Sequence, residues 1–246
     1  MGRSGTQHKS NPAMTSVTVK TAPVIWTPNR TKMTMNGTRI ERGAEMANDI
    51  SRELSKALKR VDPEYARVVL DSMTNVETYD APFLTYHRIY RVEEVGPHHS
   101  KLFYVGFAPG ERAYLLTGAP DQYVRLAHAD RVDLATPKAA EEYAAAYLEV
   151  TRSMSELFYV VHSIDDVMIR PNLDDEDAAA ATAFAERYAA IITSPSAKAT
   201  NAGYEVTVYA VREQALEQHN VTVAKDGALR EEIVILEDDL PLVYGL

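Results

Sequence analysis

The stretch FYVVHSIDDVMIRPNLDDED, residues 158–177, holds the densest group of side chains that could do chemistry, with one histidine and six carboxylates behind an apolar run. A histidine buried beside a carboxylate can be tuned to act as a general base. On this hypothesis His162 carries the proton, Asp165 or Asp166 orients it, and the protein is a cofactor-free lyase, isomerase or hydrolase. The candidate hydrogen-bond donors to a small-molecule ligand are Tyr159 and Tyr209.

The same stretch also has a purely structural interpretation. If residues 158–169 form one strand, His162 and Asp166 lie roughly 13 Å apart along it, too far for a direct hydrogen bond. Two consecutive acids are poor strand residues and favour a turn, so the run can break at Asp165 and Asp166. A histidine in such a run is more often a core residue with its hydrogen bonds satisfied than a catalytic base.

Four consecutive acids, Asp174 to Asp177, end the stretch and precede an alanine-rich helical pattern. Carboxylates in the first turn of a helix satisfy free amide donors and the positive end of the dipole. A calcium loop would need alternating oxygen ligands, a glycine and a terminal glutamate at set spacing, and these are missing. We therefore interpret the four acids as a solvated helix cap and predict no metal site.

The composition excludes several classes of chemistry. The chain of 246 residues contains no cysteine, which excludes disulfides, thiolate zinc sites, iron–sulfur clusters and a cysteine nucleophile. It also lacks the glycine-rich phosphate-binding, dinucleotide-binding and nucleophile-elbow motifs, so we predict no cofactor. No apolar run is long enough to span a membrane and no secretion signal is present, which predicts a cytoplasmic protein.

Charge divides the chain into two unlike parts. Residues 1–40 contain six basic residues and no acid, whereas residues 41–246 contain 20 basic and 35 acidic residues. An acidic body repels phosphates, so nucleic acid is not an expected partner. A basic arm attached to an acidic body predicts instead that the arm lies on a protein surface.

The arm contains one apolar segment, APVIWTP at residues 22–28. Its two prolines hold the neighbouring backbone extended and remove hydrogen-bond donors, which suits a segment that lies in a groove. The arm could pack on its own domain, or it could dock on a neighbouring subunit or another protein. The candidate partner-binding residues are Val24, Ile25, Trp26, Arg30 and Lys32.

Beyond the arm, residues 41–135 predict two helices, a meander and a short helix. Apolar residues recur every three or four positions from Glu41 to Val61, and Asp62-Pro63 has the residue types of a helix start. The second helix should bury one side, formed by Tyr65, Val68, Val69 and Met73. The expected strands are residues 83–95, 101–107 and 112–118, and the short helix is residues 119–130.

Residues 136–246 predict a second α+β part with an irregular tail. A helix begins at Thr136-Pro137, and Asp226-Gly227 signals a hairpin. The other expected elements are a strand at 158–169, a helix at 175–192 and strands at 204–212, 216–224 and 229–237. The order helix, strand, helix and three long antiparallel strands in residues 139–236 resembles the nuclear-transport-factor-like cone fold. In that fold a curved sheet wraps a helix, and the resemblance implies that the cone serves as a ligand pocket, an active site or a dimer face.

The sequence thus predicts an α+β protein of antiparallel meanders packed on helices, in parts 1–40, 41–135 and 136–246. Two functions are compatible with it. The first is a non-catalytic protein-binding or assembly module, a homo-oligomer that associates through the basic arm. The alternative is the cofactor-free enzyme described above, with its pocket inside the C-terminal cone.

Overall fold

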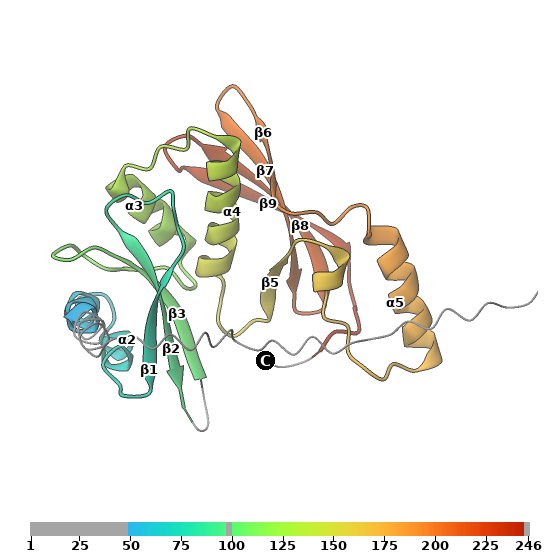
Figure 1. Cartoon of the computed structure of the whole chain (residues 1–246), viewed down its shortest axis with the longest axis horizontal. Helices are drawn as coiled ribbons and strands as arrows, with labels where there is room; N and C mark the ends of the chain where they lie inside the picture. Colours follow the sequence, from blue (N-terminus) through green and yellow to red (C-terminus); the bar gives the residue numbers. More distant parts are fainter. Residues whose placement is uncertain (1–48, 97–99, 244–246) are drawn as a thin grey trace, which may run out of the picture.

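The computed structural model describes residues 49–96 and 100–243. It has two antiparallel sheets and several helices, and α4 lies between the sheets (Figure 1). The predicted α+β class is therefore confirmed. The basic arm at 1–40, with Val24, Ile25, Trp26, Arg30 and Lys32, lies outside the described residues, as does the start of the helix expected from Glu41.

The first helical segment occupies residues 49–58 of the described chain and buries Leu54 and Leu58 completely. The next helix, α2 (Pro63–Val68), begins where Asp62 and Pro63 predict, because the Asp62 carboxylate accepts hydrogen bonds from two backbone amides of the first turn. The prediction that Met73 lies on the buried side of this helix is wrong. Met73 is 58% exposed, because α2 ends at Val68 and the chain turns before it reaches this residue.

The first sheet has strand order β1-β2-β3-β4. Its strands are β1 (Thr74–Tyr79), β2 (Arg88–Val95), β3 (Ser100–Phe107) and β4 (Tyr114–Leu115). The strand β1 was not predicted, because its residues are mostly polar. The strand predicted to begin at residue 83 begins only at Arg88 in β2, because the backbone amides of residues 85–87 donate to the Asp130 carboxylate instead of joining the sheet.

Two helices follow and match their predictions. In α3 (Pro120–Asp130) the side chains of Tyr123, Leu126 and Ala127 are buried as expected. In α4 (Pro137–Thr151) the Thr136 hydroxyl accepts a hydrogen bond from the third residue of the helix. Both helices have proline in their first turn, where its missing N–H costs nothing, and α4 also has the Thr136 cap, so both starts were predictable from residues within one turn.

The second sheet has strand order β5-β7-β8-β9, and β6 pairs with the same edge of β7 as β5 does, at the other end of that strand. Its strands are β5 (Phe158–Val161), β6 (Ser196–Ala199), β7 (Gly203–Arg212), β8 (Ala215–Ala224) and β9 (Leu229–Glu237). The last three agree closely with the sequence. The strand β6 was missed, because it lies in a stretch of polar and small residues that resembles a loop.

The prediction of a strand at residues 158–169 is wrong beyond Val161, where β5 ends. A 3-10 turn, η1 (Ile164–Asp166), replaces it, because the Asp166 carboxylate accepts hydrogen bonds from the backbone amides of His162 and Ser163. The next helix, α5 (Asp175–Tyr188), begins with Asp174 as its cap, which confirms the interpretation of the acidic run.

Both faces of the second sheet carry helices. Alternate residues of β7, such as Val206 and Val208, join the core that contains α3, α4 and part of β3, while Tyr209 and Val211 face the core that contains α5. The first of these cores contains residues from both sides of position 135. The boundary at that position and the cone resemblance stay predictions. Within the described ranges, no helix combines the length and apolar content that a bilayer crossing needs.

Candidate functional site

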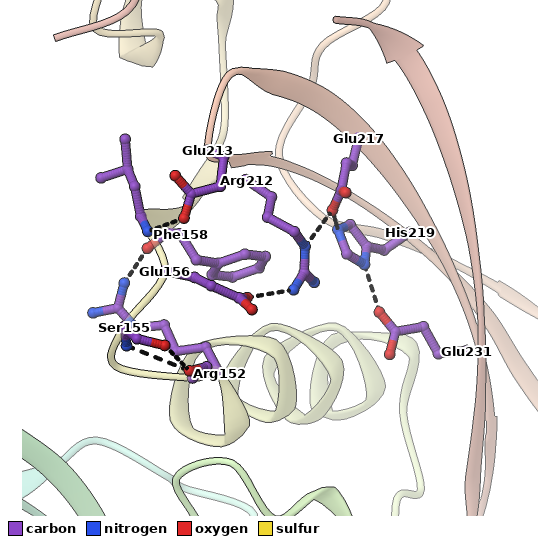
Figure 2. Close-up of polar contacts among 11 residues, drawn as sticks. Arg152, Ser155, Glu156, Phe158, Arg212, Glu213, Glu217, His219 and Glu231 are labelled. Carbon is purple, nitrogen blue, oxygen red and sulfur yellow. Dashed lines mark hydrogen bonds and ion pairs between the residues drawn. The ribbon is translucent and has the colours of Figure 1, made fainter. Parts of the chain in front are cut away.

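A cluster of charged side chains lies between the second sheet and the loop that follows α4 (Figure 2). Glu217 and His219 share one face of β8 because residues two apart on a strand point the same way. Arg212 at the end of β7 and Glu231 on β9 reach them from either side, and Glu156 approaches from the loop. We call these five residues the charge cluster.

His219 is the most deeply buried member of the charge cluster, with 0% of its surface exposed. Its Nδ1 lies 2.5 Å from Oε1 of Glu231 and its Nε2 lies 3.0 Å from Oε2 of Glu217, although the second contact lacks hydrogen-bond geometry. The ring of His219 therefore lies between two carboxylates, and only Glu231 is hydrogen-bonded to it.

Arg212 links the remaining carboxylates. Its Nε donates to Glu217 over 3.0 Å and its Nη1 donates to Glu156 over 3.0 Å. The guanidinium also lies over the Phe158 ring, 5.1 Å from the centroid. Burial lowers the pKa of Arg212, but the hydrogen bond and charge of Glu217, and then those of Glu156, outweigh burial and raise the pKa above its ordinary value. Three carboxylates, from Glu156, Glu217 and Glu231, therefore lie around Arg212 and His219.

A cavity of about 260 Å³ opens beside the charge cluster, between the end of α4 and the sheet. Glu231, whose carboxylate is hydrogen-bonded to His219, also lines this cavity. The Tyr147 hydroxyl donates a hydrogen bond to the same carboxylate over 3.3 Å. Burial, followed by the charge of Glu231, raises the pKa of Tyr147, so this hydroxyl stays a donor. A carboxylate, a phenol and the Arg212 guanidinium thus meet one cavity, which is chemistry suited to moving a proton on a small molecule.

A second surface lies at the edge of the same sheet, on β9. Across the described ranges, β9 pairs only with β8, so its other edge has no partner strand. Ile233, Val234 and Ile235 are exposed by 46%, 46% and 62%. Acids lie on both sides of this apolar trio, namely Glu231, Glu232, Glu237, Asp238 and Asp239. We call residues 229–239 the β9 edge.

The residues of the catalytic hypothesis lie elsewhere. His162 is exposed, and its backbone amide rather than its ring binds Asp166. Asp165 is exposed, and Tyr159 accepts a hydrogen bond from the backbone amide of Met168. Tyr209 lies on the α5 side of the sheet. For residues 49–96 and 100–243, no hydrogen bond joins the His162 ring to a carboxylate, so the geometry that this hypothesis needs is not formed there.

The charge cluster was not predicted from the sequence, although one signal was available. Glu217 and His219 are two residues apart on a strand that was correctly predicted, so they share a face. The other members depend on strand register and on the loop after α4, which a single sequence does not reveal. Considering only residues that the structure describes, no group of three or more histidines and carboxylates is arranged to hold a metal ion.

Comparisons with protein-family models, with curated proteins and with solved structures find no match for this chain. The charge cluster, the adjoining cavity and the β9 edge are therefore the features of the molecule that bear on its function.

Proposed function

We propose that the protein is a non-catalytic assembly module that associates with copies of itself through its basic N-terminal arm. The observation that carries this proposal is the β9 edge, where a strand that is paired on one side only presents three exposed apolar residues among acids. Natural proteins usually protect such an edge with charge on the strand, proline or a bulge, because it otherwise pairs with another chain. The only register shift in β9 lies near its C-terminal end, beyond the exposed trio.

Charge supports the same proposal. The described residues contain 19 basic and 33 acidic residues, whereas residues 1–40 contain six basic residues and no acid. Opposite charges attract over distances of about 10 Å at 0.1 M salt and accelerate encounter. Both the acidic composition and the absence of cysteine also suit the cytoplasm, which we keep as part of the proposal.

The native mass of the full-length chain tests this function. We expect a dimer or larger oligomer in analytical ultracentrifugation at low salt, and a lower mass when the salt concentration is raised. The variant Arg30→Glu/Lys32→Glu should be monomeric, because it places acids against an acidic surface. A monomer at every salt and protein concentration would refute the assembly function.

A second candidate function is a cofactor-free enzyme, which one observation favours. Glu231 lines the cavity and is held by the buried His219, so it could accept a proton from a ligand. Hydrolysis of p-nitrophenyl esters by the full-length chain gives a direct test. Turnover that is lost in Glu231→Gln and retained in His162→Ala would support this candidate; equal rates in all three proteins would exclude it for this class of substrate.

A further inference from the structure

We infer that the β9 edge binds residues 20–32 of a second copy of this chain. This inference rests on the proposed assembly function and names the two surfaces that meet. The occupant is the segment around Val24, Ile25 and Trp26, which would lie along β9 and extend its sheet.

The backbone of β9 provides the first argument. The strand runs from Leu229 to Glu237 and pairs with β8 along one side (Figure 1). An edge strand presents a row of backbone donors and acceptors, and an extended peptide binds there by adding a strand. Near the end of β9 this row is already occupied, because the Tyr188 hydroxyl donates to the carbonyl of Leu236. The free part is therefore the stretch that contains the exposed apolar residues.

The exposed side chains provide the second argument. The pairing of β8 with β9 places Ile233 opposite His219 and Ile235 opposite Glu217, so both isoleucines lie on the face that carries the charge cluster. Val234 points to the other face. A strand added at this edge would cover apolar surface on both faces of the sheet, which a helix or loop on one face would not do.

Charge decides between two possible occupants. A second β9 strand would bring two copies of one sequence together, and residues 229–239 carry one base, Arg230, and five acids. Such pairing places like charges near one another and is opposed. Residues 20–32 carry Lys20, Arg30 and Lys32 and no acid. In this segment basic residues lie on both sides of Val24, Ile25 and Trp26, just as acids lie on both sides of residues 233–235 in the β9 edge. The two segments are therefore complementary in charge.

The prolines of the arm are compatible with this position. Pro23 and Pro28 enclose the apolar segment. Proline lacks a backbone donor and is tolerated on an edge strand, where one side faces solvent. The short stretch between them can pair with β9, while the basic residues outside it meet the acids. Exchange of arms between two copies would form this interface twice, as two-fold symmetry requires.

Trp26 is the only tryptophan in the chain, so its fluorescence reports the docking. We expect the emission maximum of the full-length protein to shift to the red on dilution, as the arm is released into water. Val234→Lys places a charge in the middle of the β9 edge and should raise the dimer dissociation constant at least about tenfold. Val95→Lys is the matched control: Val95 is 53% exposed at the end of β2, and its change should be less than about twofold.

A photo-cross-linking residue at position 26 identifies the surface and the copy. In a mixture of isotope-labelled and unlabelled full-length protein, we expect labelled–unlabelled cross-links to residues 229–237. An oligomer that is unaffected by Val234→Lys, or whose cross-links lie elsewhere or only within one copy, would overturn the inference and leave the assembly function standing. A chain that is monomeric at all concentrations would overturn both.

Discussion

Two buried histidines in this protein, His87 and His219, contact carboxylates. The two sites differ in whether the carboxylate is fully occupied by hydrogen bonds or also faces a cavity. Asp130, only 2% exposed, accepts backbone hydrogen bonds from Thr85, Tyr86 and His87 at 2.5, 2.8 and 2.6 Å. It also lies 2.9 Å from Nδ1 of His87. All four contacts hold the chain before β2 in place, so the role of this site is structural. We call Asp130 and its contacts with residues 85–87 the latch.

The charge cluster around His219 has a different character. Its carboxylates bind side chains rather than backbone, and one of them, Glu231, also lines a cavity. Its members come from three strands and a loop, so no single turn depends on it. The comparison teaches that a buried histidine–carboxylate contact is structural when backbone amides saturate the carboxylate. It is available for chemistry when the carboxylate keeps a face toward open space.

The largest effect should come from removing the latch. In Asp130→Ala three backbone donors and the His87 ring lose their acceptor. Two of these donors, the His87 amide and ring, are buried, and each buried donor left unpaired costs about 1–3 kcal/mol, so we expect the free energy of unfolding to fall by about 4 kcal/mol. Urea denaturation measures this fall. Asp121→Ala, in the exposed first turn of the same helix, should cost less than about 1 kcal/mol. Equal losses in both variants would contradict the assignment of a latch.

A smaller loss should follow from breaking the charge cluster. Glu217→Ala leaves Arg212 and His219 without their shared carboxylate, and removing one partner of a buried ion pair costs about 3 kcal/mol. Replacing the three together, Arg212→Met/Glu217→Leu/His219→Leu, should change the free energy of unfolding by only about 1 kcal/mol, because the two carboxylates that lose a partner, Glu156 and Glu231, line the cavity and are partly exposed. If the triple variant is less stable than Glu217→Ala, the charge cluster is a structural element like the latch.

The smallest effect should be the acid dependence of the latch. Burial raises the pKa of Asp130, but the hydrogen bonds from Thr85, His87 and Tyr86 outweigh it and lower the pKa below its ordinary value. A carboxyl whose pKa is lower in the folded state stabilises the fold above its unfolded pKa of about 3.9. This contribution is lost as the pH falls through the folded pKa.

The variant Asp130→Asn lacks this titration, so the gap in free energy of unfolding between wild type and Asp130→Asn should narrow as the pH falls from about 6 to about 3. Urea denaturation at each pH measures it. A gap that stays constant over this range would show that Asp130 does not contribute through its charge.

Local signals explain which parts of the fold were predictable. The helix starts at Asp62, Thr136 and Asp174 were predicted because a cap and the amides it binds lie within one turn. The strands β7, β8 and β9 were predicted because their apolar patterns are long. By contrast, β1 and β6 are short and polar, and each exists because a neighbouring strand supplies its hydrogen bonds.

By itself, the sequence determined the α+β class, the helix caps, the long strands and the division of charge between residues 1–40 and the rest. Each of these features depends on composition or on residues close together in the chain. Only the tertiary structure decided which side chains meet. Strand register brings His219 to Glu231, the loop after α4 brings Glu156 to Arg212, and the end of the sheet leaves Ile233 and its neighbours uncovered. These contacts join residues far apart in the chain, and local pattern carries no information about such distances.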